Sequence, residues 1–217
     1  LAFNSFINKS KINLEGINNI DEIDISNAEI LGYKIKHLGL SEMENGKLIQ
    51  RVHPCLIKKE SPISNVNDVL NAVIIEAKPI GKFVLKGEGA GPGPTTSALV
   101  SDICSVLRGN IKFPFSVSHS NRKKIKPLDL SEKTFSSYIR LDVIDKKGVL
   151  LSITKIMSKN KISVKRLIQK PFKGKKFASI IIISHKAKNK NLVKCINRLS
   201  KSNFILSEPK FIRIEEI

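Results

Sequence analysis

The sequence predicts an α+β protein made of two units, of which the second is a βαββαβ ferredoxin-like unit. The first observation is size: 217 residues that are 41% hydrophobic suffice for a packed core, and two small domains fit that length better than one. The second is that regular periodicity disappears over residues 116–135, where Ser, Lys, His and Pro accumulate. We therefore expect domains at residues 1–115 and 136–217, joined by a linker at 116–135.

The first unit begins with a predicted helix and a predicted strand. Residues 24–32 form a short helical segment, with Asp24 or Ser26 as the expected N-cap and Gly32 as its end. Over residues 48–56, apolar residues either alternate with polar ones or follow one another directly, and this pattern predicts a strand.

A strand pair and a second helix complete this unit. Residues 73–75 and 83–85 are β-rich and flank a Pro/Gly turn at residues 78–81. A glycine-rich loop at residues 87–97 then leads into a helix. The helix is indicated by apolar residues at helical spacing, which are Leu99, Val100, Ile103, Val106 and Leu107. The loop should therefore lie between the end of a strand and the start of a helix.

The second unit alternates strand and helix patterns regularly. Apolar residues alternate with polar ones over residues 139–143, and the β-branched run at 180–183 is too short for a helix. The expected order is strand 139–143, turn 145–148, helix 149–160, strand 162–168, hairpin connection 170–174, strand 178–184, helix 192–199, and a closing strand built from residues 204–206 and 211–214. This order places both helices on one face of an antiparallel sheet.

The net charge of +19 raises nucleic acid as a partner, but the rest of the composition argues against it. Lysines are scattered through every segment, only seven of the 38 basic residues are Arg, and there are no Trp and two Tyr. The densest basic run, residues 121–126, fits a mobile linker. We therefore expect no nucleic-acid partner and keep that function as the weakest hypothesis.

The cellular compartment is predicted from sequence features that are absent. The apolar runs fall short of the roughly 20 residues that a membrane-spanning helix needs, so we expect no membrane association. The start of the chain has no signal-peptide features and suggests that the sequence begins within a longer protein. Cys55, Cys104 and Cys195 fit neither a disulfide framework nor a metal site, which favours the cytoplasm and no metal.

The glycine loop has the local chemistry of a ligand site without a standard motif. It matches neither G-x-G-x-x-G nor a phosphate loop. Four glycines at alternate positions let a backbone approach a ligand closely, and the amides of the following helix start favour negative charge. Pro94 suits an early helical position. The alternative is that the loop is only a tight turn.

The loop and its surroundings together resemble homoserine dehydrogenase. The resemblance rests on RVHP at residues 51–54, SNVNDVLNAV at 64–73, and GEGAGPGPTTSA at 87–98 with Asp102. It runs almost continuously over residues 1–108, with Asn4 where members usually have Gly. The βαββαβ unit in turn resembles the ACT regulatory domain of bacterial members.

This resemblance implies an enzyme that interconverts aspartate 4-semialdehyde and homoserine with NAD or NADP, as a homo-oligomer. Members begin with a Rossmann domain, and their catalytic Lys and Asp precede the segment that matches Leu1. A fragment without that part would be inactive alone, so no catalytic residue is assigned here. Gly91 matches the glycine whose backbone lies against the nucleotide, and Gly89 is assigned beside it, although Gly87 and Gly89 also suit a turn-shaping role.

The ACT-like turn implies an amino-acid effector. Asp145, Gly148, Val149 and Leu150 match the first strand-to-helix turn, where an acidic group can meet an ammonium and helix-start amides a carboxylate. The family implies threonine. Lys147 replaces a common Pro, which weakens preorganisation of the turn. The alternative is that Asp145 caps the helix and Gly148 shapes a turn.

Two further interpretations remain open from the sequence. The chain could be a stand-alone regulatory module, in which the ACT-like half binds an amino acid and the first half mediates dimerisation. His53, beside Pro54 in apolar surroundings, fits a packed, hydrogen-bonded histidine better than a catalytic one.

Overall fold

A computed structural model describes residues 2–6, 9–110, 117–171 and 176–217. The contacts divide the chain into two compact units. Unit 1 comprises residues 1–7 and 59–125, and unit 2 comprises residues 8–58 and 126–217. The chain is of mixed α and β structure, and each unit contains its own sheet.

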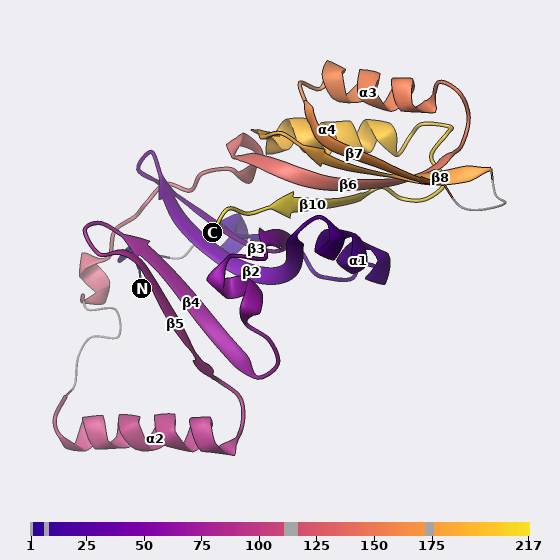
Figure 1. Cartoon of the computed structure of the whole chain (residues 1–217). Helices are drawn as coiled ribbons and strands as arrows, with labels where there is room; N and C mark the ends of the chain where they lie inside the picture. Colours follow the sequence, from indigo (N-terminus) through magenta and orange to yellow (C-terminus); the bar gives the residue numbers. More distant parts are fainter. Residues whose placement is uncertain (1, 7–8, 111–116, 172–175) are drawn as a thin grey trace. The chain divides into compact units, whose positions relative to one another are not determined.

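Unit 2 is built on an eight-stranded sheet (Figure 1). Its strands are β1 Asn13–Leu14, β2 Tyr33–Glu44, β3 Lys47–Lys58, β6 Thr134–Ile144, β7 Val164–Pro171, β8 Phe177–Ser184, β9 Ala187–Lys188 and β10 Lys210–Ile214. The order is β1-β3-β10-β6-β8-β7, with β2 paired to β3 and β9 to β6. Strand β10 runs antiparallel to β6 and parallel to β3, so it joins the C-terminal strands to those from residues 8–58.

The predicted βαββαβ order is confirmed. It runs β6, α3 (Val149–Lys159), β7, β8, α4 (Asn189–Leu199) and β10. Both helices pack on one face of the sheet, as Figure 1 shows. The core between them is made by buried side chains from both layers, including Ile139, Leu141, Ile153, Met157, Ile180, Ile182, Leu192 and Leu199.

Helix α1 (Glu22–Ile30) contributes to a second core, on the other face of the same sheet. Ala28 packs there with buried residues that include Tyr138 and Ile212. The predicted cap was wrong: the N-cap is Asp21, and Asp24 is the third helical residue of a capping box. Gly32 follows the helix with φ 84°, the left-handed conformation expected of glycine there.

Strand β2 was not predicted, and it forms a long hairpin with β3. The two strands pair from Tyr33 opposite Lys58 to Glu44 opposite Lys47. Asn45 and Gly46 form the turn, both at positive φ. Asn-Gly is a strong signal for such two-residue hairpin turns, so the sequence carried this information.

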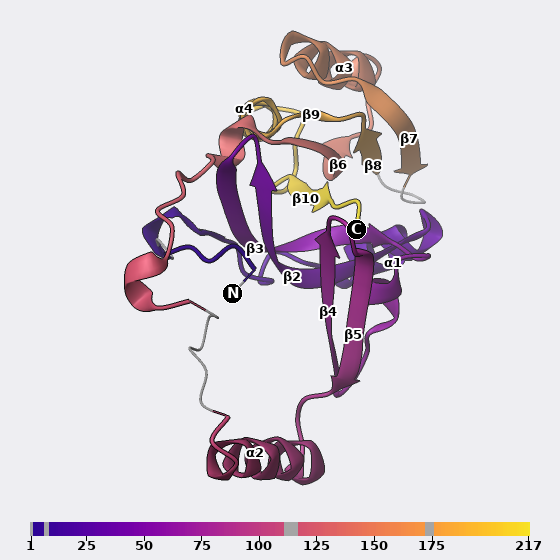
Figure 2. The same ribbon diagram turned by 90° about the vertical axis from the view of Figure 1, so that its left-hand side faces the viewer.

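Unit 1 contains the predicted strand pair and helix. Strands β4 (Leu70–Ala77) and β5 (Gly81–Glu88) pair antiparallel, and α2 spans Pro92–Leu107. Figure 2 shows β5 leading through a short connection to α2. All five apolar residues that predicted this helix are exposed, by 53% at Val100 to 80% at Leu107.

The described part of the predicted linker is hydrogen-bonded into the two units. The Lys123 amide donates to the Asn4 carbonyl at 2.8 Å within unit 1. The Leu128 amide donates to the Leu48 carbonyl at 2.8 Å within unit 2, and Phe135 is buried in the core. The mobile character expected for residues 121–126 stays a prediction. Residue 116 lies outside the described residues, and the domain boundaries stay a prediction.

Two smaller expectations concern the second unit. Residues 204–206 belong to no named strand; Ile205 forms an isolated bridge with Val143, and the closing strand begins at Lys210. Pro209 immediately before it has no amide hydrogen to donate to a sheet. Most of the predicted connection at 170–174 lies outside the described residues.

No helix in the described ranges combines the length and apolarity needed to cross a bilayer.

Candidate cofactor loop and effector turn

The glycine loop lies between β5 and α2, as predicted. Gly91 is the N-cap of α2, with φ 116° and ψ 160°. Residues with a Cβ are strongly disfavoured there, whereas glycine adopts this conformation readily. The position therefore requires glycine for its backbone shape.

Gly89 is constrained by crowding. A Cβ at this residue would overlap the side-chain amide of Asn71, on the neighbouring strand β4. The Gly89 amide also donates to the Val69 carbonyl at 3.3 Å. Gly87 and Gly93 have open space around them. Gly89 thus fixes the path of the loop, as the turn-shaping role requires.

The start of α2 presents few amide donors. The first helical amides have no partner within the helix. Pro92 and Pro94 carry no amide hydrogen, and the Thr95 amide donates to the Gly91 carbonyl at 3.2 Å. Gly93 therefore has the amide best placed to donate outward. The loop offers an exposed backbone, and its two prolines reduce the number of amides at the helix start that could enclose a phosphate.

The four predicted effector residues meet at one turn between β6 and α3. Asp145 is exposed; its amide donates to the Lys176 carbonyl at 2.9 Å, and its carboxylate accepts from Gln169 at 3.5 Å. Gly148 is the N-cap of α3 in the left-handed conformation, and Val149 and Leu150 begin the helix. The alternative that Asp145 caps α3 is wrong, because Gly148 holds that position and no side chain caps it.

A buried ion network joins β3 to the chain end beyond β10. Arg51 donates two hydrogen bonds to Glu215, at 2.7 and 2.8 Å, and His53 Nε2 lies 2.9 Å from Glu215 Oε1. Burial would raise the pKa of Glu215, but the hydrogen bonds of His53 and Arg51 and the Arg51 charge lower it to about 2. Arg213 extends the network by donating to Glu15 at 2.8 Å. Glu215 is therefore ionised and fully paired.

A second network surrounds Arg140 beneath α1. Its guanidinium donates to Asp24 at 2.7 Å, Asp21 at 2.6 Å and Asp142 at 2.8 Å. The Tyr138 hydroxyl also donates to Asp24, at 2.7 Å, and burial followed by this hydrogen bond raises the pKa of Tyr138. These contacts attach the start of α1 to the sheet.

His53 has the packed surroundings that the sequence predicts, whereas its partners were not predicted. His53 is buried and hydrogen-bonded, as expected for a packed histidine. Arg51 and Glu215 are 164 residues apart, and no spacing rule links them. Pairing of β3 with β10 brings them together.

The described ranges contain no group of three His, Cys, Asp or Glu residues suited to hold a metal. Cys55, Cys104 and Cys195 are free thiols, and burial raises the pKa of Cys55 to about 12 and that of Cys195 to about 11. These two thiols are therefore poor nucleophiles at neutral pH.

Comparison with known proteins relates the chain to a group of oxidoreductases. A family model described as homoserine dehydrogenase matches residues 1–104. The homoserine dehydrogenases of Helicobacter pylori and Neisseria gonorrhoeae are 32% and 33% identical over 99% and 100% of this chain, and 51% of each relative is covered. The chain thus spans about half the length of the curated relatives it matches.

A solved structure agrees with these matches. The homoserine dehydrogenase of Thiobacillus denitrificans superposes with a TM-score of 0.87 at 29% identity, covering 99% of this chain and 50% of that one. The fold and the loop between β5 and α2 are thus similar to those of an oxidoreductase family. Over nearly its whole length the chain is similar to homoserine dehydrogenases.

Proposed function

We propose that the protein containing this chain interconverts aspartate 4-semialdehyde and homoserine with NAD or NADP, in threonine, methionine and isoleucine biosynthesis in the cytoplasm. The proposal rests on the family match and on the glycine loop, which presents exposed backbone at the start of a helix. The chain represents the C-terminal part of that enzyme, including part of its catalytic domain. It acts in a homo-oligomer.

We propose further that a nucleotide-binding Rossmann domain belongs to the same enzyme and is not part of this sequence. The apolar residues of α2 support this, because contiguous exposed apolar surface usually marks an interface. The chain alone then lacks the groups that bind substrate and move protons, and it should show no turnover.

Gly91 is proposed to contact the dinucleotide through its backbone. A residue with a Cβ cannot adopt the Gly91 conformation without strain, so the close approach depends on glycine. The bound nicotinamide supplies the hydride chemistry. This chain provides one wall of the site and holds it in place through β5 and α2.

The test uses the protein expressed from the complete reading frame that contains this chain. Homoserine-dependent reduction of NAD or NADP is the measurement, and we expect Gly91→Ala to raise the KM for the dinucleotide about tenfold or more, because the backbone conformation changes. Gly16→Ala, in open space outside the loop, should leave it unchanged. Absence of homoserine oxidation in the unmodified protein would refute the proposed activity.

The βαββαβ unit is proposed to be an ACT domain whose turn at Asp145 binds an amino acid, with threonine as the family's effector. Asp145 would meet the ammonium, and the amides at the start of α3 the carboxylate. Calorimetric titration of the chain with threonine should give saturable binding that Asp145→Asn abolishes. Asp129→Asn, an exposed carboxylate outside this turn, is the control, and equal binding by both variants would contradict the assignment.

A further inference from the structure

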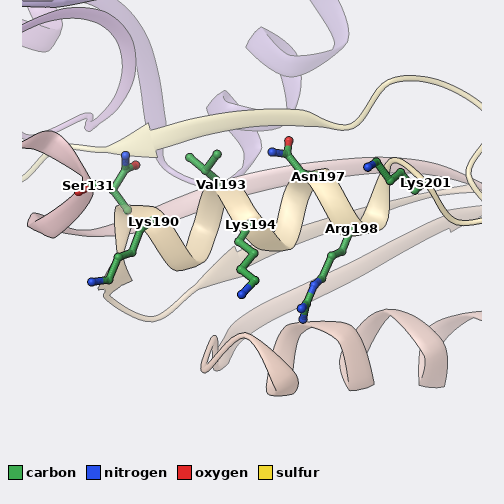
Figure 3. A pocket seen from close by; sticks show the side chains of 8 residues that line it. Ser131, Lys190, Val193, Lys194, Asn197, Arg198 and Lys201 are labelled. Atoms are coloured by element: carbon green, nitrogen blue, oxygen red, sulfur yellow. The ribbon is translucent and has the colours of Figure 1, made fainter.

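A row of basic side chains follows the exposed side of α4. Lys190, Lys194 and Arg198 recur every four residues, and Lys201 follows just beyond the end of the helix. Figure 3 shows the first three projecting from the same side of α4. We call these three residues the basic face. Lys201 projects from the other side in Figure 3, and all four residues line an open pocket together with Ser131, Asn189, Val193 and Asn197.

Most of this charge has no acidic partner. Glu132 accepts from Lys190 at 2.7 Å and from Lys188 at 2.9 Å, and these two bonds lower its pKa to about 2. Arg198 donates to the neutral amide of Asn160 at 3.2 Å. Within the described ranges, no carboxylate pairs with Lys194, Arg198 or Lys201.

Without an acidic partner, the cations in this row repel one another. Like charges four residues apart on a helix destabilise it. An anion lying along the row would remove this repulsion and gain the attraction of several cations at once. The face is therefore electrostatically complementary to an acidic partner.

The spacing of the row determines the shape of that partner. At 1.5 Å per residue, successive cations lie about 6 Å apart along the helix and the three span about 12 Å. A small anion reaches only part of this length. In an extended peptide, alternate side chains point the same way at intervals of about 6.6–6.8 Å, and flexible lysine stems absorb the difference.

The lining residues argue against a nucleic acid strand. Single-stranded nucleic acid is usually held by aromatic rings on which the bases stack. The pocket contains no aromatic residue and a single Arg. Asn197 instead offers an amide that can bond to a peptide backbone, beside the apolar surface of Val193.

We propose that the basic face of α4 binds an extended acidic segment of a partner protein in which acidic residues alternate along the sequence. This interaction is independent of the dehydrogenase activity and of the Asp145 turn.

The test is fluorescence anisotropy of the full chain with a short labelled peptide in which Glu alternates with Ser. The charge reversal Lys194→Glu/Arg198→Glu should weaken binding about tenfold or more, because two attractions become repulsions. The matched control is Lys155→Glu/Lys159→Glu, which makes the same charge change at two exposed lysines of α3. It should alter affinity less than about twofold, since those residues lie outside the row.

Four outcomes would overturn the proposal. These are no saturable binding, an equal loss in the α3 control, equal affinity for a peptide with its Glu residues grouped in one block, or tighter binding of oligothymidylate with the same sensitivity to the α4 reversal. Circular dichroism verifies that each variant is folded, and Lys194→Ala/Arg198→Ala provides a milder substitution with the same expected direction.

Discussion

Glu215 shows how a single residue connects distant parts of the sequence. It bonds to Arg51 and His53 of β3, while it sits one residue beyond the end of β10. Removing one partner of a buried ion pair leaves the other charge uncompensated, which costs about 3–5 kcal/mol. The carboxylate therefore matters more to the fold than its position near the chain end suggests.

We predict that Glu215→Gln lowers the free energy of unfolding at pH 7 by about 1.5–3 kcal/mol, because Arg51 loses its charged hydrogen bonds to Glu215 and keeps only its ion pair with Glu42. The pKa of Glu215 is lowered from 4.5 to about 2 in the folded chain, so its stabilisation is complete above pH 4.5 and is lost as the pH falls toward 2. As the pH falls from 4.5 to 2, the free energy of unfolding of the variant, measured by urea titration, should therefore decrease less than that of the unmodified chain.

The control for this prediction is the neighbouring residue Glu216. Its exposed carboxylate pairs with Lys186 at 2.6 Å, and exposed pairs contribute about 1 kcal/mol or less. Glu216→Gln should keep the pH dependence of the unmodified chain. A Glu215→Gln variant with that same dependence would show that Glu215 is not the titrating group.

At the scale of elements, β10 is the strand that joins the two halves of unit 2. It pairs with β6 on one side and with β3 on the other. Ile212 lies buried in the core that α1 covers, whereas Leu206, in the segment expected to form part of the closing strand, is exposed by 51%. The two residues have similar side chains in different surroundings.

We predict that Ile212→Ala destabilises unit 2 by about 2–5 kcal/mol, as deletion of a buried aliphatic side chain does. Leu206→Ala should change stability by about 0.5 kcal/mol or less, since it lies on the surface. Chemical denaturation followed by circular dichroism measures both. Equal losses would place Leu206 in the core and restore the sequence-based closing strand.

At the scale of the molecule, unit 2 is assembled from two separate stretches of chain. Residues 8–58 supply α1, which covers one sheet face, and β3, which pairs with β10. The predicted domain at residues 136–217 contains only the other stretch. Cutting there would expose apolar residues of that face, among them Ile181 and Ile183.

We predict that the fragment 126–217 melts at lower temperature than the full chain and binds a hydrophobic dye, because its second core is incomplete. Adding residues 8–58 as a separate peptide should raise the melting temperature and release the dye. Cooperative melting of 136–217 alone at the temperature of the full chain would instead support the sequence-based boundary.

The local elements could be predicted from the sequence, because helix and strand periodicity, Gly and Pro act over a few residues. The sequence predicted the βαββαβ order, the strand pair and the glycine loop at Gly91. Its motifs also determined the family resemblance, since those residues lie close together in the chain. The Asn45-Gly46 pair is a local signal for a hairpin turn, although strand β2 before it was not predicted.

Contacts between segments that lie far apart in the sequence could not be predicted, and the folded structure was needed to find them. Pairing of β3 with β10, the covering of the sheet by α1 and the Arg51–Glu215 pair join residues more than 100 positions apart. Local patterns carry no information on which distant strand completes a sheet, because any strand edge offers the same backbone donors and acceptors. That choice is made by side chains that meet only after folding.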